Sequence, residues 1–244
     1  MKLEENSFWF QHRNNLLHSV IQRFPFQQNF VDIGGGNGFQ IAYLAKKYPD
    51  RKFFLVEPGY EGCLNAKFRG LQQIYNIPFQ DFPFAHNSIG AVGLFDVLEH
   101  IEDDQKALNE LSSMLQTGTM IYVTVPAYNI LWSKADNQAG HFRRYTLKSL
   151  IKLANQSGLK PIYSSYFFFY LPPITFSLRT LPYRLGIGKL LSEEKKFANN
   201  IQEHNPAALI NRFFNKLNHW ELNRIRNSKI SFGASCIALF KKIV

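Results

Sequence analysis

A run of glycines directly after a short apolar segment constrains the fold of this chain more than any other feature. Residues 29–33 form the apolar segment, and the turn Gly34-Gly35-Gly36-Asn37-Gly38 follows it. Glycines let the backbone turn sharply and come close to a ligand. The free N–H groups at the start of a following helix point toward the same ligand. The pattern therefore predicts a buried strand, a nucleotide-type binding turn and a helix.

Apolar runs typical of buried strands alternate with helical spacing as far as about residue 125. We expect further strands over residues 52–56, 72–76, 89–95 and 119–125. We expect helices over residues 6–24, 38–48, 62–68 and 103–115. This alternation predicts an α/β, Rossmann-like, mostly parallel sheet with helices on both faces. Ligands of such sheets bind outside the carboxyl ends of the strands, where the glycine turn lies.

The second half of the chain completes the sheet and interrupts the alternation once. We expect a polar loop, a helix and a sixth strand over residues 127–145, 146–156 and 159–169. A final strand over 231–241, paired next to the sixth, gives a seven-stranded sheet with one antiparallel strand. Residues 170–228 are then a helical, basic and aromatic insertion before the last strand, within a single domain over 1–244.

The residues around the glycines narrow the class of nucleotide. A dinucleotide-binding turn has a third glycine where this chain has Phe39, because packing near the pyrophosphate needs a small residue. Glu57 ends the second predicted strand, 19 residues after Gly38, where an acid can accept hydrogen bonds from both ribose hydroxyls. Asp32 lies two residues before the glycines. It can hold a cationic group of the ligand or bond to N–H groups of the turn.

Three segments together carry a resemblance to a known family: VDIGGGNG, FFLVEP and GAVGLFDVLEHIEDD. They resemble class I S-adenosylmethionine-dependent methyltransferases, and the resemblance covers residues 29–125. Phe8–Asn14 and Gly140–Thr146 are similar to the FWFQHRN-like and GHFRRYT-like elements of bacterial members. The resemblance implies an enzyme that transfers a methyl group, with S-adenosylmethionine as its cofactor. That cofactor has no pyrophosphate, so Phe39 is compatible with it.

The resemblance also implies which residues contact the cofactor. The glycine turn would line the methionine end of the cofactor. The end of the second strand would contact its ribose, and the end of the fourth strand would contact its sulfonium. The implied cofactor residues are Asp32, Gly34, Gly35, Gly36, Glu57, Pro58, Phe79, Phe95 and Asp96. The chain departs from the family after the third strand, where members usually have an acid that bonds the adenine amine. No acid occurs there before Asp81, so we expect backbone groups and the Phe79 ring to hold the adenine.

Methyl transfer from a sulfonium requires mainly in-line positioning of the acceptor. A general base is needed only when the acceptor is a hydroxyl or a protonated amine. The candidates for that catalytic role are His100, His141 and Tyr145. Structural alternatives remain open for both histidines: His100 can pack under the sheet edge, and His141 can bind an arginine or the backbone.

Two further sets of polar residues admit alternative interpretations. Asp96, Glu99 and His100 lie within one turn and can face one ion. The same segment is common in family members thought to be metal-free, so we expect no bound metal. Arg143 or Arg144 can orient an anionic substrate through a guanidinium fork, or can tie their loop to an acid of the protein.

Positive charge is concentrated late in the chain, which has a net charge of +10. Residues 1–139 carry 11 basic and 14 acidic residues, a net −3, whereas residues 140–244 carry 17 and 4, a net +13. Together with the aromatic insertion, this is compatible with a small-molecule substrate that is anionic or lipid-linked, and with peripheral membrane contact. The basic residues lack a repeated aromatic platform, which disfavours nucleic acid. A cap that buries its own aromatics or forms a dimer is the alternative.

Two cysteines, Cys63 and Cys236, lie on apolar stretches and are expected to be buried thiols in a reducing compartment. The first residues show no basic-then-apolar signal pattern, so we expect a cytoplasmic protein. Two functional alternatives stay open at this point. One is an NAD(P)-binding Rossmann oxidoreductase, which Phe39 argues against. The other is a non-catalytic protein that binds S-adenosylmethionine without turnover.

Overall fold

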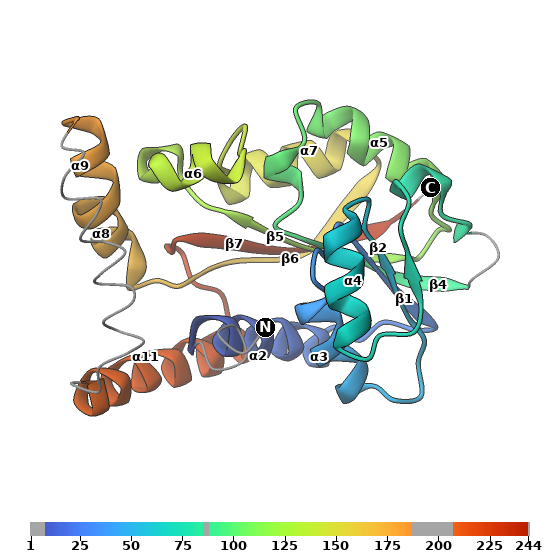
Figure 1. The fold of residues 1–244 in the computed structure, drawn as a ribbon, viewed down its shortest axis with the longest axis horizontal. Helices are drawn as coiled ribbons and strands as arrows, with labels where there is room; N and C mark the ends of the chain where they lie inside the picture. Colours follow the sequence, from blue (N-terminus) through green and yellow to red (C-terminus); the bar gives the residue numbers. More distant parts are fainter. Residues whose placement is uncertain (1–7, 85–87, 187–206, 244) are drawn as a thin grey trace.

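The centre of the molecule is one twisted seven-stranded sheet (Figure 1). The structure, a computed structural model, describes residues 8–84, 88–186 and 207–243. Its strands are β1 Asn29–Ile33, β2 Phe53–Val56, β3 Ile74–Tyr75, β4 Ile89–Phe95, β5 Met120–Pro126, β6 Leu159–Phe167 and β7 Ser235–Lys242. They lie in the order β3-β2-β1-β4-β5-β7-β6, with β7 antiparallel to both neighbours and the other pairs parallel. The predicted seven-stranded, mostly parallel sheet is confirmed.

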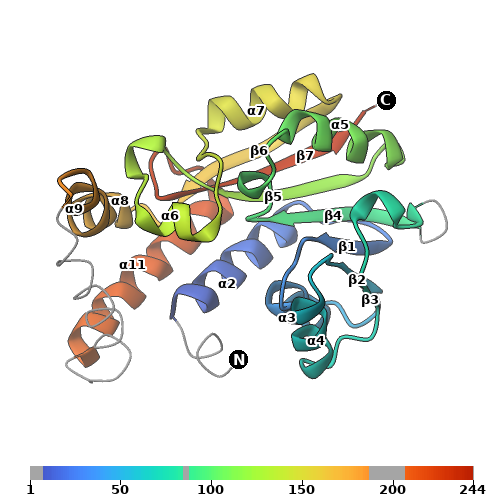
Figure 2. The same cartoon turned by 45° about the horizontal axis from the view of Figure 1, so that its top comes forward.

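Helices cover both faces of this sheet and bury two separate cores (Figure 2). One core takes side chains from α2 Phe8–Arg23, α3 Phe39–Lys47, α4 Tyr60–Phe68 and α11 Ala207–Asn227. The other takes them from α5 Asp104–Met114 and α7 Leu147–Gln156. Neighbouring strand residues alternate between the two, because successive side chains of a strand point to opposite faces. Thus Phe30 packs in the first core and Val31 in the second.

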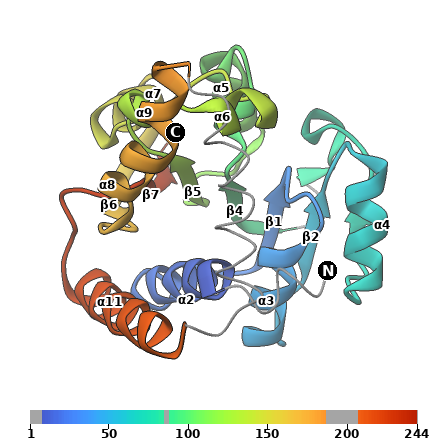
Figure 3. The ribbon, with the colours of Figure 1, turned by 60° about the vertical axis from the view of Figure 1, so that its left-hand side comes forward.

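The insertion is helical, as predicted, wherever the structure describes it. It begins as one continuous helical segment made of α8 Leu171–Thr175, the π-helical turn η5 Phe176–Thr180 and α9 Leu181–Arg184. It ends with α11, which lies beside α2 under the sheet (Figure 3). Residues 187–206 in the middle of the insertion, and residues 6 and 7 of the first predicted helix, lie outside the described residues. Among the described helices, none is both long enough and apolar enough to cross a bilayer.

The segment expected to be a polar loop after β5 contains two short helices. These are the 3-10 turn η4 Asn129–Leu131 and the helix α6 Lys134–Ala139. Six residues are too few for a helical period to be visible in the sequence. The sequence feature that marks the start of α6 is a capping box, in which Asp136 accepts a hydrogen bond from the backbone N–H of Ser133 at 2.8 Å.

Candidate functional site

The glycine turn joins β1 to α3 at the carboxyl edge of the sheet. Gly34 and Gly36 have left-handed backbone angles, with φ of 65° and 54°, which only glycine adopts without strain. A Cβ atom on Gly35 would lie 2.4 Å from Oδ2 of Asp32 and 2.6 Å from Cδ1 of Leu55. The turn therefore passes directly over the Asp32 carboxylate, and any side chain at Gly35 would separate the two.

Asp32 is fully buried at the end of β1, and neither of its carboxylate oxygens has a hydrogen-bond partner among the described residues. Burial raises its pKa to about 8; the Arg13 charge opposes this shift and the Glu57 charge adds to it. Buried polar groups of native proteins are almost always hydrogen-bonded. An unpartnered carboxylate under a glycine turn therefore fits a ligand that brings a cationic group, such as the amino group of S-adenosylmethionine.

Glu57 lies at the end of β2, next to the turn. Its Oε2 accepts a hydrogen bond from the N–H of Gly36 at 2.9 Å, and its Oε1 accepts one from Gly59 at 2.7 Å. Each carboxylate oxygen retains a lone pair, so ribose hydroxyls can still donate to it. The side-chain amide of Asn76 donates to the carbonyls of Glu57 and Pro58, both at 2.9 Å. This ties the ends of β2 and β3 together.

Asp96 follows β4 directly and has a left-handed backbone, with φ of 57°. That conformation is strained for a residue with a side chain, and contacts from two other elements hold it. The backbone N–H of Asp96 donates to the carbonyl of Thr124, and the Thr124 hydroxyl donates to Oδ1 at 3.0 Å. Nη1 of Arg13 lies 2.7 Å from Oδ2. The pair fixes α2 against the carboxyl end of β4.

Left-handed backbone recurs at the ends of two further strands, β5 and β6. Tyr128 after β5 has φ of 57°, and Phe168 after β6 has φ of 56°. With Gly34 and Asp96, four parallel strands leave the same edge of the sheet through such a residue. Strained backbone concentrates at ligand sites, and this is the edge where ligands bind to sheets of this type.

Phe79 and Phe95, both predicted to contact the cofactor, differ in whether their rings are accessible to a ligand. Phe79 begins the 3-10 turn η1 Phe79–Asp81 after β3 and is half-buried, lining a small apolar hollow with Ile33 and Val97. Phe95 is buried in the core, where its ring stacks on Phe30 with centroids 6.2 Å apart. Phe79 can therefore offer its ring to a ligand, whereas Phe95 reaches the strand end only through its backbone.

A second polar cluster lies just beyond Asp96. The 3-10 turn η3 Leu98–His100 carries Glu99 and His100, and the segment after α6 brings in His141. The rings of His100 and His141 meet edge to face, with centroids 4.7 Å apart. Burial, with the nearby His141, lowers the pKa of His100, so its imidazole is neutral at pH 7. The structure thus brings together two of the three predicted catalytic residues.

Tyr145, the third candidate, is buried and faces Asp104. Its hydroxyl donates a hydrogen bond to the Asp104 carboxylate at 2.6 Å. Burial and this bond raise the pKa of the Tyr145 hydroxyl, which keeps its proton at physiological pH. Arg143 pairs with the other Asp104 oxygen, 2.8 Å from Oδ1. These contacts tie the loop to α5, and a catalytic role for Tyr145 stays a prediction.

Arg144 forms a bidentate pair with the buried Asp136. Its Nε lies 2.7 Å from Oδ1, and its Nη2 lies 3.0 Å from Oδ2. The ring nitrogen Nδ1 of His141 lies 2.9 Å from the same Oδ1. Because both arginine forks bind acids of the protein, the structure shows the loop-fixing alternative for Arg143 and Arg144.

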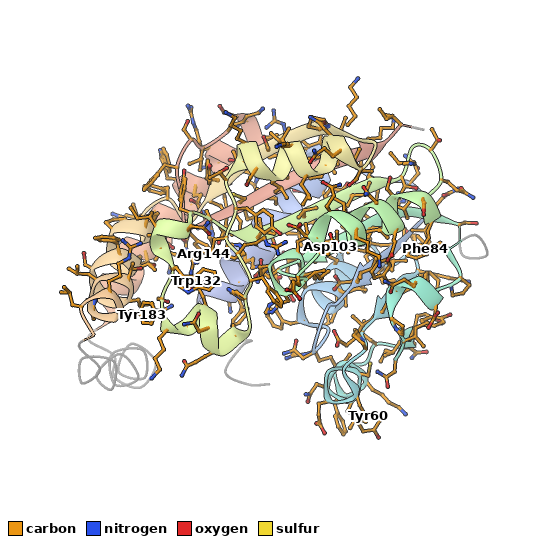
Figure 4. The ribbon with its side chains drawn as sticks, turned by 90° about the horizontal axis from the view of Figure 1, so that it is seen from above. Tyr60, Phe84, Asp103, Trp132, Arg144 and Tyr183 are labelled. Atoms are coloured by element: carbon orange, nitrogen blue, oxygen red, sulfur yellow. The ribbon has the colours of Figure 1, made fainter. Side chains whose placement is uncertain are left out.

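The segment around α6 also contacts the insertion. Figure 4 shows Trp132, Arg144 and Tyr183 on the same side of the molecule. The side chain of Asn137 bonds to two of these residues. Its oxygen accepts a hydrogen bond from the Trp132 indole at 3.0 Å, and its amide donates one to the Tyr183 hydroxyl at 2.9 Å. The start of the insertion is therefore docked next to the segment that carries His141.

Several contacts at this edge were not predicted from the sequence. Nε2 of His12 lies 2.6 Å from Oε2 of Glu221, and both residues are buried. The other Glu221 oxygen accepts a hydrogen bond from the N–H of Phe169 at 2.9 Å. Glu221 thus joins α11, α2 and the end of β6. The FWFQHRN segment was noted as a motif, but nothing local reveals that its histidine pairs with a residue 209 positions later.

Comparison with known proteins agrees with this geometry. Residues 9–164, more than half of the chain, match the family model described as methyltransferase domain. No curated protein matches the chain. Solved structures share the fold. A putative methyltransferase from Haloferax volcanii, in complex with the Trm112 methyltransferase activator, is 16% identical, with a TM-score of 0.57, over 96% of this chain and 90% of that one.

A geranyl diphosphate C-methyltransferase from Streptomyces coelicolor is 11% identical, with a TM-score of 0.59, over 96% of this chain and 79% of that one. A putative sarcosine dimethylglycine methyltransferase from Galdieria sulphuraria is 15% identical, with a TM-score of 0.56, over 95% of this chain and 84% of that one. These likenesses show the fold, and the family match shows the membership. Neither favours the oxidoreductase or the non-catalytic alternative. The chain therefore belongs to the methyltransferase domain family and is an S-adenosylmethionine-dependent methyltransferase.

Proposed function

We propose that the cofactor binds over the glycine turn, with Asp32 as the residue that holds its amino group. The observation that carries this assignment is the Asp32 carboxylate, which is fully buried and has no partner among the described residues. Gly34, Gly35 and Gly36 bring the backbone within reach of the methionine end. Glu57, supported by Pro58, accepts hydrogen bonds from the ribose.

The adenine and the sulfonium are proposed to lie at two neighbouring strand ends. The ring of Phe79 packs on the adenine, in place of the acid that other members have after the third strand. The backbone after Phe95 and the Asp96 carboxylate face the sulfonium. Arg13 acts through Asp96, because their 2.7 Å ion pair fixes the position of that carboxylate.

S-adenosylmethionine supplies a methyl group that is already activated on a sulfonium sulfur. The chain must then hold the acceptor in line and accept its proton when the acceptor is a hydroxyl or an amine. We place proton removal at the cluster of Glu99, His100 and His141. Glu99 and His100 follow Phe95 by four and five residues, and His141 joins them from the segment after α6. The neutral His100 is in the protonation state that an acceptor of protons requires.

For the acceptor we propose a small molecule with an apolar, lipid-like part and an anionic group. Support comes from the first helical segment of the insertion, which exposes large apolar residues every three or four positions. These residues are Ile174, Leu178, Leu181 and Leu185. Exposed apolar residues on a surface rich in basic residues are typical of membrane interfaces, and residues 140–244 carry a net +13.

The acceptor class is tested with S-adenosylmethionine labelled in its methyl group. The protein is incubated with the organic and aqueous phases of a bacterial lipid extraction, and Asp32→Asn serves as the inactive control. We expect label to enter the organic phase with the native protein alone. Label found only in an aqueous product separated from S-adenosylmethionine by chromatography would exclude a lipid-like acceptor and leave the methyltransferase activity standing.

The contact with a lipid surface is tested separately. Replacing Leu178 and Leu185 by Asp should reduce co-sedimentation with vesicles of anionic phospholipid by at least about tenfold, since each change removes apolar area and adds a repelled charge. The matched control is Phe68→Asp on α4, where Phe68 is 75% exposed. Equal losses in both variants, or no loss in either, would overturn the role of this helical face.

A further inference from the structure

We propose that Glu99, His100 and His141 form a binding site for a divalent transition-metal ion next to the site of methyl transfer. One carboxylate oxygen and one nitrogen from each imidazole lie within 4.8 Å of one another. Two imidazoles and one carboxylate are a donor set that suits Zn²⁺, Co²⁺ and similar ions. From the sequence we considered a different trio, with Asp96 in the place of His141, and expected no bound metal there.

The structure separates Asp96 from this set. Asp96 is not among the ligand atoms that lie within 4.8 Å of one another, and its two oxygens point to other partners, one to Arg13 and the other to the hydroxyl of Thr124. His141, which is 41 positions beyond His100, takes its place because the segment after α6 folds back over η3. The N–H of Phe142 donates to the carbonyl of Glu99 at 2.7 Å and fixes this approach.

Glu99 provides the first independent indication of a ligand. The residue is 1% exposed, and its Oε2 has no hydrogen-bond partner among the described residues. A buried carboxylate oxygen without a partner is rare in native proteins. The two nearby guanidinium groups are already neutralised, Arg13 by Asp96 and Arg144 by Asp136.

The surroundings of the imidazoles provide the second indication. Nδ1 of His141 is held by the buried Asp136 at 2.9 Å, which leaves Nε2 as the free ligand atom. The ring of His100 bonds to the backbone carbonyl of Ala139. Metal-binding histidines almost always have their second nitrogen held by a carboxylate or a carbonyl in this way. Each imidazole therefore has one nitrogen bonded within the protein and a second nitrogen that can bind an ion.

The site has an open side and room to close on an ion. His100 is exposed, so its side chain can move to reach bond lengths of about 2.0–2.1 Å. Three protein ligands leave a coordination position for water or for an acceptor oxygen. This inference rests on the proposed function and refines it. With the ion bound, the cluster would still promote proton removal, because the ion would lower the pKa of an acceptor hydroxyl, which would release its proton to water on the open side, while the two imidazoles serve as ligands.

The test is titration of the tag-free, metal-stripped protein with Co²⁺, followed by visible absorption and by calorimetry. We expect one ion per chain with micromolar or tighter affinity. Glu99→Gln and His141→Gln should each weaken the affinity by at least about tenfold. The control, His219→Gln, changes an exposed histidine on α11 and should leave the affinity unchanged.

His100→Gln changes an exposed side chain and keeps the test meaningful if a buried variant fails to fold. Binding of S-adenosylmethionine is measured on the same samples, so loss of the metal site and loss of the cofactor site are distinguishable. No Co²⁺ binding by the folded native protein would overturn the proposal. So would binding that is equally tight in the native protein, Glu99→Gln and His100→Gln.

Discussion

Two buried aspartates at the carboxyl edge of the sheet have opposite surroundings. Asp32, under the glycine turn, has no partner for either oxygen among the described residues. Asp136, in the segment after β5, is equally buried but accepts hydrogen bonds from Ser133, His141 and Arg144. Burial raises the pKa of Asp32 to about 8. For Asp136, burial also acts upward, but the bonds from Arg144 and His141 outweigh it and lower the pKa.

This difference in hydrogen bonding indicates two different roles for a buried carboxylate. A buried carboxylate whose bonds are all made within the protein stabilises the fold. A buried carboxylate without bonds lowers stability, and its presence is explained by a ligand that completes it. This contrast supports the proposal that the turn region binds the cofactor, whereas the region around Asp136 holds His141 and its loop in place.

The largest effect is expected from Asp136→Asn. This change leaves the Arg144 guanidinium buried without its charge partner, and breaking a buried pair in this way costs about 3–5 kcal/mol. Urea unfolding measures the loss, with Asp50→Asn as the control because Asp50 is exposed. An equal free energy of unfolding in the two variants would show that the Asp136 network does not stabilise the fold.

Glu57→Gln should weaken cofactor binding by about tenfold to hundredfold. The change removes a charged acceptor of hydrogen bonds, and such bonds contribute about 1.5–3 kcal/mol each. The control is Glu61→Gln, an exposed residue in the first turn of α4. If calorimetry gives both variants the affinity of the native protein, Glu57 does not bind the ribose.

Asp32→Asn should raise the free energy of unfolding, whereas Asp136→Asn should lower it. The effect of Asp32→Asn is expected to be the smaller of the two. The folded pKa of Asp32 lies above the unfolded value of about 3.9. Native stability therefore falls as pH rises from about 4 to about 8, and the amide variant avoids this loss. At pH 8 we expect the variant to be more stable by at least about 1 kcal/mol. Thermal unfolding at pH 4.5 and pH 8 measures the difference, and a gap that does not widen with pH would contradict the unpartnered state of Asp32.

The glycine-turn region could be predicted from the sequence, whereas most contacts of the region around Asp136 and of the packed helices could not. Gly34 to Gly38, Glu57 and the strand ends follow one another locally, because a βα turn places its ligand groups within a short stretch of chain. The sequence also indicated the seventh strand and the helical insertion. The contacts of Arg13 with Asp96 and of His12 with Glu221 depend on packing between helices far apart in the chain. No local pattern encodes such pairs.

The same limit explains the cluster after β4. Glu99 and His100 could be read as neighbours on one turn, but His141 reaches them only through the fold of α6 and the bond from Asp136. Likewise, the position of Phe95 in a motif predicts contact with the cofactor near the sulfonium, but not which part of the residue makes it. The ring of Phe95 is buried against Phe30 because side chains alternate along β4, which sends that ring into the core.

We propose above all that the bound cofactor provides the hydrogen-bond partner that the Asp32 carboxylate lacks. Calorimetric titration of S-adenosylmethionine into the native protein, Asp32→Asn and Asp50→Asn tests it most directly, with NADH as the control ligand. We expect micromolar binding to the native protein and to Asp50→Asn, a loss of at least about hundredfold in Asp32→Asn, and no binding of NADH. Equal affinity for the native protein and a folded Asp32→Asn variant, or no binding of S-adenosylmethionine to the folded native protein, would contradict the claim.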